Sequence, residues 1–282
     1  MLISLVICTR NRYSSLRNCL EYIQRLESPG EWELVVVDNG STDGTADFLK
    51  GFVEKASFRV VLAYEPKSGL GRARNTGIAK ATGEIIAFTD DDCYVSPDFL
   101  IRILEVFKDQ RFGFMGGRIL LYDETDAPIT IRPQTDIRII KPHSFIFTGE
   151  LQGANMAARR SLLEEISGFD PDLGAGTPFA CEDVDFQARA SQSGAAGIYH
   201  PGVLLWHHHG RKPGEDFVKL LRRYDHARGA YYAKFILKTP TRTLFLKNWY
   251  WLVASNFDRR DFASILRELA GAIHYTLIQS WR

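Results

Sequence analysis

The sequence predicts an α/β fold, in which a doubly wound, mostly parallel sheet is followed by a C-terminal helical extension. Continuous apolar runs recur in the first third of the chain, and such runs are typical of strands buried on both faces of a parallel sheet. Segments with apolar residues at helical spacing lie between these runs. Polar residues follow the runs directly, and ligands bind at the carboxyl ends of strands in sheets of this kind.

The first half of the chain alternates regularly between the two patterns. Apolar runs predict strands over residues 2–8, 32–37, 60–63 and 84–89. Amphipathic segments predict helices over residues 14–26, 42–52 and 71–81. Because strand–helix–strand connections are almost always right-handed, this alternation predicts parallel strands with helices on both faces of the sheet.

The chain beyond residue 90 is less regular. Helices are predicted over residues 97–107, 161–166 and 182–193, and strands over residues 113–121 and 203–206. Residues 123–141 are polar, contain prolines and predict a long, mobile loop that could close over a ligand and exclude water. We expect one domain over residues 1–210 and a basic, aromatic helical extension over residues 211–282.

The charge of the chain is unevenly distributed. The net charge of the 282 residues is +1, but residues 1–210 have a balance of −7 and residues 211–282 a balance of +8. The basic extension indicates either an anionic partner surface or an ordinary solvated helical face. Its aromatic residues also suit a membrane interface, with packing against the body or a dimer contact as the alternatives.

Other classes of protein are disfavoured by composition. The four cysteines lie far apart and form no Cys-x-x-Cys pair, which argues against a zinc or redox motif. No basic residues precede the first apolar run, unlike in a signal peptide, and no apolar stretch reaches the roughly 18 residues of a membrane-spanning helix. We therefore expect a cytoplasmic protein, with peripheral attachment to the inner face of the cell membrane still open.

An aspartate triplet, Asp90-Asp91-Asp92, ends the fourth predicted strand. Three adjacent carboxylates repel one another unless a cation offsets their charge, and carboxylate oxygens suit Mg²⁺ or Mn²⁺. The alternative is a solvated acidic turn. Asp38 ends an earlier strand at the same edge, where it could bind a ribose or a base. The first strand is followed by residues 9–12, which contain no glycine, so a nicotinamide cofactor is disfavoured.

Three further segments carry candidate functional residues. The glycines of residues 69–77 permit a close backbone approach, and Arg72 and Arg74 could meet a phosphate, although an ordinary turn would look the same. Glu182-Asp183 begins a predicted helix, where acids either complement the helix dipole or supply a general base. Of three consecutive histidines, at most His207 and His209 face one site.

These motifs occur in an order that resembles the family-2 glycosyltransferases of the GT-A fold. The resemblance covers roughly residues 1–210. It rests on residues 2–12, Val35-Val36-Val37-Asp38-Asn39-Gly40-Ser41-Thr42-Asp43, Arg72-Ala73-Arg74-Asn75-Thr76-Gly77, Phe88-Thr89-Asp90-Asp91-Asp92, Gly153-Ala154-Asn155-Met156 and Glu182-Asp183-Val184-Asp185-Phe186.

The resemblance implies an inverting hexosyltransferase that uses Mn²⁺ or Mg²⁺. Asp183 would be the catalytic base, with Glu182 near the acceptor. Asp92 and Asp90 would hold the metal together with His207, or with His209 as the fallback. The implied nucleotide-sugar site comprises Thr9, Arg10, Arg12, Asp38, Arg74, Asn75, Asp90, Asp91, Gly153, Ala154 and Asn155.

The implied partners are a nucleoside-diphosphate sugar as donor and a glycan or lipid-linked acceptor, with a role in polysaccharide biosynthesis. No nucleic-acid partner is expected. An anionic membrane surface could bind residues 213–282, and a homodimer is also open. Two rival functions are a sugar nucleotidyltransferase, for which residues 9–12 lack the usual glycine-rich loop, and a non-catalytic sugar-nucleotide or glycan-binding protein.

Overall fold

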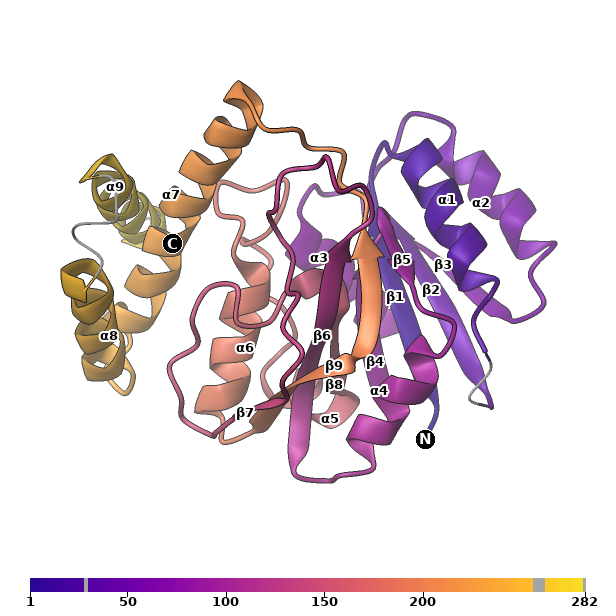
Figure 1. Ribbon diagram of the computed structural model, residues 1–282, viewed down its shortest axis with the longest axis horizontal. Helices are drawn as coiled ribbons and strands as arrows, with labels where there is room; N and C mark the ends of the chain where they lie inside the picture. Colours follow the sequence, from indigo (N-terminus) through magenta and orange to yellow (C-terminus); the bar gives the residue numbers. More distant parts are fainter. Residues whose placement is uncertain (28–29, 256–261, 281–282) are drawn as a thin grey trace.

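The computed structural model describes residues 1–27, 30–255 and 262–280 (Figure 1). Its strands are β1 (Ile3–Thr9), β2 (Trp32–Asp38), β3 (Arg59–Tyr64), β4 (Ile85–Asp90), β5 (Cys93–Val95), β6 (Phe112–Leu121), β7 (Arg138–Ile140), β8 (Met156–Arg159) and β9 (Ala196–His207). Its helices are α1 (Tyr13–Ile23), α2 (Thr45–Val53), α3 (Leu70–Lys80), α4 (Phe99–Phe107), the short 3₁₀ helix η1 (Gly153–Asn155), α5 (Arg160–Glu165), α6 (Glu182–Gln192), α7 (Glu215–Leu237), α8 (Arg242–Ser255) and α9 (Phe262–Ser280).

The strands form one mixed, mostly parallel sheet in the order β3-β2-β1-β4-β8-β6-β9-β5, with β7 beside β9. Pairs β1–β2, β2–β3, β1–β4 and β6–β9 are parallel. Strand β8 runs antiparallel to both β4 and β6. The predicted doubly wound α/β fold is therefore confirmed.

The strand sequences are continuously apolar because both faces of the sheet are covered. Val6 and Phe88 point into a core shared with α3, α5, α6 and α7. Leu5 and Ala87, their neighbours in the chain, point into a second core shared with α1, α2 and α4. Successive side chains in a strand alternate between faces, so each of these strands must be apolar at every position.

Parallel pairing brings the ends of β1, β2 and β4 to one edge of the sheet. In the register of the sheet, Thr9 lies opposite Asp38, and Cys8 lies opposite Asp90. His207, the last residue of β9, pairs with Cys93 of β5, immediately after the aspartate triplet. The fold thereby gathers the predicted polar side chains around the triplet.

The sheet also differs from the prediction in its second half. The loop predicted over residues 123–141 contains β7, which pairs with β9, and Arg132 forms an isolated bridge with Ile119. The strand predicted over residues 203–206 is the end of a longer strand, β9, which starts at Ala196. The register along β6 jumps between Gly117 and Arg118, and this irregularity accommodates the residues around Pro201 that hid the strand from the sequence pattern.

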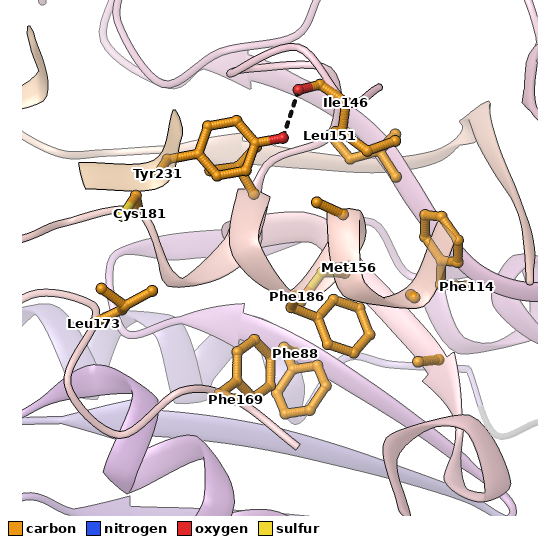
Figure 2. Packing of buried hydrophobic residues seen from close by; sticks show 14 of the residues in the cluster. Phe88, Phe114, Ile146, Leu151, Met156, Phe169, Leu173, Cys181, Phe186 and Tyr231 are labelled. Carbon is orange, nitrogen blue, oxygen red and sulfur yellow. Dashed lines mark hydrogen bonds between the residues drawn. The ribbon is translucent and has the colours of Figure 1, made fainter. Parts of the chain in front are cut away.

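The second half of α7 packs into the core of the body. Figure 2 shows Tyr231 of α7 beside Cys181, in the core that also contains Phe88, Phe169 and Phe186, with its hydroxyl donating to the carbonyl of Ile146 at 2.8 Å. Lys234 is buried and binds Asp170 and Asp185 at 2.6 and 2.5 Å. This part of the basic extension therefore packs against the body.

Helix α9 crosses α7 at two glycines. A Cβ added at Gly229 would overlap the carbonyl of Glu268, and one added at Gly271 would overlap the carbonyl of His226. Helices α8 and α9 lie on the side of α7 that faces away from the sheet (Figure 1). Among the described residues, the helices lack the combination of length and apolar character needed to cross a membrane.

Candidate active site

A cavity of about 520 Å³ lies at the carboxyl edge of the sheet and contains the aspartate triplet. Its wall includes residues from β1, the start of α3, the start of α6, the end of β9 and α7. Of the residues predicted to be catalytic, to bind the nucleotide sugar or to hold the metal, those that line this cavity are Thr9, Arg10, Arg12, Arg74, Asp90, Asp91, Asp92, Gly153, Ala154, Glu182, Asp183 and His207.

The triplet is held by partners from β1 and the turn after it. The hydroxyl of Thr9 donates to Asp91 at 2.7 Å. The guanidinium of Arg12 lies 3.2 Å from Asp91 and 2.6 Å from Asp92. Burial raises the pKa of Asp91 to about 7, against the lowering effect of Arg12, and the nearby charge of Asp92 raises it further. Asp91 thus carries a proton more readily than Asp92 does.

His207 is the histidine that reaches the triplet. Its Nε2 lies 3.2 Å from Oδ1 of Asp92. Burial would raise the pKa of Asp92, but the hydrogen bond from His207 and the charge of Arg12 hold that pKa well below its usual range. Burial alone would lower the pKa of His207, yet the hydrogen bond and charge of Asp92 raise it. The two side chains therefore stabilise each other as an ion pair.

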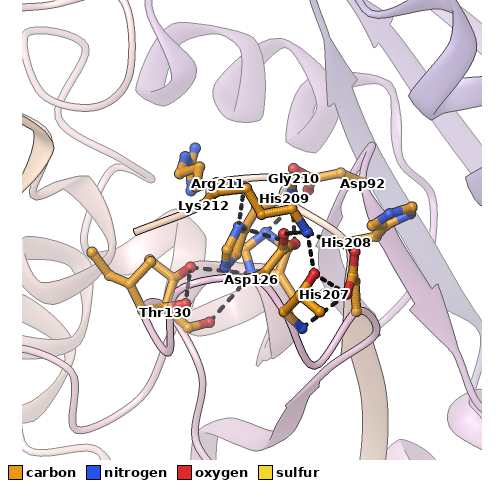
Figure 3. Close-up of polar contacts among 12 residues, drawn as sticks. Asp92, Asp126, Thr130, His207, His208, His209, Gly210, Arg211 and Lys212 are labelled. Carbon is orange, nitrogen blue, oxygen red and sulfur yellow. Dashed lines mark hydrogen bonds and ion pairs between the residues drawn. The ribbon is translucent and has the colours of Figure 1, made fainter. Parts of the chain in front are cut away.

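The other ring nitrogen of His207 contacts the loop before β7. Nδ1 lies 3.3 Å from the carbonyl oxygen of Thr130 and 3.2 Å from its hydroxyl (Figure 3). A carbonyl oxygen only accepts hydrogen bonds, so this contact keeps a proton on Nδ1 and directs Nε2 toward Asp92. Thr130 has a φ of 53°, in the left-handed region, which shows how tightly this loop turns beside the histidine.

The neighbouring histidines lie elsewhere. His209 is buried with its Nδ1 3.5 Å from Asp126, and His208 contacts the hydroxyl of Tyr94 at 2.8 Å. Figure 3 shows His209 within the network of Asp126, which also accepts from the backbone of Gly210. Of the three histidine side chains, the structure therefore places that of His207 against the carboxylate of Asp92, whereas His208 meets Asp92 through its backbone N–H, which donates to the Asp92 carbonyl.

The donor set beside the triplet fits a hard divalent cation. Asp90, Asp92 and His207, together with Cys93, offer ligand atoms that all lie within 4.8 Å of one another. Carboxylates suit both Mg²⁺ and Mn²⁺, and an imidazole suits Mn²⁺ better. Mg²⁺ and Mn²⁺ prefer oxygen ligands to sulfur, so Cys93 is the least suited member of the group.

Arg74 links the triplet to the start of α6. Its guanidinium donates to Glu182 at 2.9 Å and lies 3.4 Å from Asp90. It also lies 5.2 Å from the ring centroid of Phe169. Burial raises the pKa of Glu182 to about 7, although Arg74 opposes the shift. Arg74 therefore fixes the relative positions of Asp90 and Glu182 across the cavity.

Asp183 is half-buried and lines the cavity from the first turn of α6. Its Oδ2 accepts the backbone N–H of Gly153 at 3.0 Å. A Cβ at Gly153 would lie 2.8 Å from Arg74 and 3.1 Å from Asp183, so only glycine allows this approach. The backbone of η1 thus orients the carboxylate that the sequence predicts as the base.

Three predicted site residues lie outside the cavity wall. Asp38 accepts the N–H of Ser41 at 2.8 Å, and its neighbour Asn39 lines the cavity in its place. The side chain of Asn75 exchanges hydrogen bonds with the backbone of Phe169, and the amide of Asn155 donates to the carbonyls of Arg118 and Val203.

The cavity also has lining residues that were not predicted. Arg211, Tyr224 and Arg228 line it from the segment that follows β9, and Thr130 lines it from the loop before β7. Arg228 binds Glu268 at 2.8 Å, whereas the described residues give the side chain of Arg211 no carboxylate partner. The basic character of this segment was visible in the sequence, but its approach to the triplet depends on how α7 folds back over the sheet.

A mostly parallel sheet that ends in an acidic triplet, with a cavity flanked by arginines, defines the class of GT-A glycosyltransferases. Residues 4–167, more than half of the chain, match the family model described as Glycosyl transferase family 2. The chain belongs to this family and is a glycosyltransferase.

Curated relatives agree with the family. The chain is 25% identical over 222 residues to glycosyltransferase AglE of Haloferax volcanii, which covers 78% of this chain and 70% of AglE. It is 28% identical to the pre-mycofactocin glycosyltransferase of Mycobacterium tuberculosis, over 73% of this chain and 43% of that protein. It spans 48% of the putative glycosyltransferase EpsH of Bacillus subtilis, at 29% identity. The chain thus spans less than half the length of two of these relatives.

Solved structures share the fold. The mannosyltransferase PcManGT from Pyrobaculum calidifontis, in complex with GDP-Man and Mn²⁺, superposes with a TM-score of 0.68 at 21% identity, covering 99% of this chain and 82% of that one. S. aureus TarS residues 1–349, in complex with UDP-GlcNAc, superposes with a TM-score of 0.65 at 17% identity, covering 96% and 79%. The likeness extends over the C-terminal helices.

Proposed function

We propose that this glycosyltransferase moves a sugar from a nucleoside-diphosphate sugar to a hydroxyl of a glycan or lipid-linked acceptor, with inversion at the anomeric carbon. One observation carries the proposal. A carboxylate oriented by a backbone N–H, that of Asp183, faces the same cavity as the group of Asp90, Asp92 and His207. A base and a site for a charged leaving group therefore share one space.

Asp183 acts as the general base. It takes the proton of the acceptor hydroxyl while the acceptor oxygen forms a bond to the anomeric carbon. The bond from that carbon to the diphosphate oxygen breaks on the opposite face, so the configuration inverts and the nucleoside diphosphate leaves with the electron pair. Glu182 is less suited to this role because Arg74 holds it in a buried ion pair.

Asp92, Asp90 and His207 would hold Mn²⁺ or Mg²⁺. The ion, when bound, supplies positive charge that stabilises the diphosphate leaving group. Arg12 would release Asp92 and turn toward the phosphates. Arg211 and Arg10, which line the same cavity, add positive charge from the protein itself.

The remaining predicted contacts divide between nucleotide and sugar. Thr9 and Asn39 line the cavity at the ends of adjacent strands, where we place the base and ribose, and Asp38 supports this edge through its contact with Ser41. Asp91, held by Thr9, is placed against the donor sugar. Arg74 keeps Asp90 and Glu182 in position, and its direct contact with the donor remains a prediction. The loop that carries Thr130 shields the cavity from water, which limits hydrolysis of the donor.

Labelled sugar nucleotides test the proposal against its rivals. A thermal-shift screen of nucleoside diphosphates and their sugars with Mg²⁺ or Mn²⁺ identifies the donor. Slow hydrolysis or transfer of the label is the expected result. Binding without any turnover indicates a non-catalytic binding module, and formation of a sugar nucleotide from a sugar phosphate indicates a nucleotidyltransferase. NMR of the glycoside product then shows whether the anomeric configuration has inverted.

Asp92→Ala tests the proposed metal site separately. Calorimetry with a nucleoside diphosphate is run with and without Mn²⁺ on both proteins. The parent protein should bind more tightly with Mn²⁺, and the variant should show no such gain, because it lacks the carboxylate shared by His207 and Arg12. An unchanged gain in the variant would remove Asp92 from the metal site.

A further inference from the structure

Helix α9 exposes a continuous apolar stripe. Phe262, Leu266, Leu269, Ile273 and Leu277 follow one another at intervals of three or four residues and are all exposed, Ile273 at 61%. This spacing places them on one side of the helix. The opposite side carries Glu268, Gly271 and Tyr275, which are buried against the rest of the protein.

The stripe borders an apolar groove between three helices. A groove of about 370 Å³ is lined by Leu269, Ile273 and Leu277 of α9, Leu246 of α8 and Leu237 of α7. Almost all of the exposed surface in this groove is apolar. Tyr250 lies one turn beyond Leu246 on α8 and is 76% exposed. Figure 1 shows α8 and α9 on the far side of α7 from the sheet, so neither of them is covered by the body on this side. Soluble proteins seldom expose so continuous an apolar surface unless it binds something.

In the part of this region that the structure describes, the exposed charged side chains are all positive. Over the described residues 238–255 and 262–280, the exposed cations include Lys238, Arg242 and Lys247. The same residues contain one carboxylate, that of Glu268, and it is fully buried. Among the described residues, this exposed apolar face includes Tyr250, is bordered by cations and has no exposed carboxylate, which matches the chemistry of an anionic lipid surface.

We propose that α8 and α9 dock this face on a phospholipid bilayer that contains anionic lipids. We call it the docking face and define it by Leu246, Tyr250, Leu266, Leu269, Ile273 and Leu277. The apolar side chains enter the boundary between head groups and acyl chains, and Lys238, Arg242 and Lys247 meet the phosphates. Of the basic extension, only the helices α8 and α9 would lie on the membrane.

A second copy of the chain fits the face less well. A two-fold symmetric contact places a surface against itself, so Arg242 and Lys247 would approach their own copies. The described part of the face offers no exposed carboxylate to offset that repulsion. Anionic lipid supplies the missing negative charge, which is why the proposal commits to a bilayer.

Docking would bring the cavity close to the membrane. Helix α7 carries Tyr224 and Arg228 of the cavity and Leu237 of the apolar groove. Arg228 and Leu237 are separated by about 14 Å along the helix at 1.5 Å per residue. A lipid-linked acceptor could therefore reach the cavity from the bilayer, a consequence that rests on the transferase function proposed above.

Vesicle sedimentation tests the docking face. The full chain is mixed with vesicles of phosphatidylcholine alone, or of phosphatidylcholine with phosphatidylglycerol. We expect binding to the mixed vesicles that weakens with salt. The double variant Ile273→Glu, Leu277→Glu should bind these vesicles at least about tenfold more weakly, because it replaces apolar contacts with repelled charge. Lys247→Gln should weaken binding to the mixed vesicles.

The matched control carries the same change in charge elsewhere. Tyr64→Glu, Ile139→Glu replaces two apolar side chains of similar exposure, on β3 and β7, and should bind vesicles as the parent does. Equal pelleting of parent and docking-face variant overturns the proposal. The proposal is also overturned if the parent protein does not bind vesicles but forms a dimer in light scattering, and if the double variant Ile273→Glu, Leu277→Glu is a monomer. Sedimentation requires no turnover, so a chain that binds vesicles without transferring sugar contradicts only the transferase proposal.

Discussion

Nε2 of His207 lies 3.2 Å from Oδ1 of Asp92, although the two residues lie far apart in the sequence. The contact exists because β9 ends beside β5, so the last residue of one strand meets the turn that follows β4. Nδ1 of the same ring is occupied by Thr130. The histidine is therefore oriented with one nitrogen toward the acidic triplet.

His207→Ala should weaken Mn²⁺ binding in the presence of nucleoside diphosphate by tenfold or more, in the range of about 10–100-fold seen when the surroundings of a metal site are altered. His209→Ala is the control, because its ring contacts Asp126 instead of Asp92. Calorimetric titration measures both variants. A larger loss in His209→Ala than in His207→Ala would reverse the assignment.

Arg211→Ala should raise the dissociation constant for the nucleoside diphosphate by about tenfold, which corresponds to one charge-assisted hydrogen bond. Arg211 lines the cavity and has no carboxylate partner among the described residues, so its charge is available to a ligand. Arg222→Ala removes an exposed arginine of α7 that is not part of the cavity wall and should bind normally. Equal effects of the two variants would show that only net charge matters.

Lys234→Met should lower the free energy of unfolding by about 3 kcal/mol, because it leaves Asp170 and Asp185 without their shared buried cation. Arg189 still pairs with Asp185 and limits the loss. Urea denaturation gives the value. Lys219→Met, which removes an exposed cation of the same helix, should change stability little. A stable Lys234→Met variant would argue against the packing of α7 on the body.

Gly229→Ala should destabilise the crossing of α7 and α9, because the added methyl group meets the backbone of Glu268, which cannot move aside as a side chain could. We expect a lower melting temperature and faster proteolysis within α9. Gly51→Ala is the matched control, since Gly51 lies in α2 with no atom near its added Cβ, and it should be neutral or stabilising. Equal behaviour of the two variants would contradict the close helix contact.

Much of the sheet was predictable because its strands are buried on both faces. β1, β2 and β4 carry runs of buried apolar residues, and such runs are typical of strands covered on both faces. β5 has only three residues, too few for a recognisable pattern. Pro201 and Gly202 interrupt β9, so its sequence predicts only the last part of the strand, residues 203–206. Their pairing depends on contacts between distant parts of the chain.

The site was predictable to the extent that it lies at strand ends. Asp90, Asp91 and Asp92 follow a buried strand, and such residues gather at one edge of a parallel sheet. The choice of His207 over His209 required the loop that carries Thr130, which local sequence does not place. Arg211 lines the cavity from the segment directly after β9 and Tyr224 lines it from α7, and a basic segment alone does not reveal that path.

Asp183→Asn is the most direct test of the proposed transferase. The amide keeps the size of the side chain but cannot take a proton from the acceptor. Product formation is measured with the donor identified by thermal shift, and donor binding is measured by calorimetry with Mn²⁺. We predict that transfer is abolished while the donor binds as tightly as to the parent. Near-normal turnover of Asp183→Asn would contradict the assignment of Asp183 as the base.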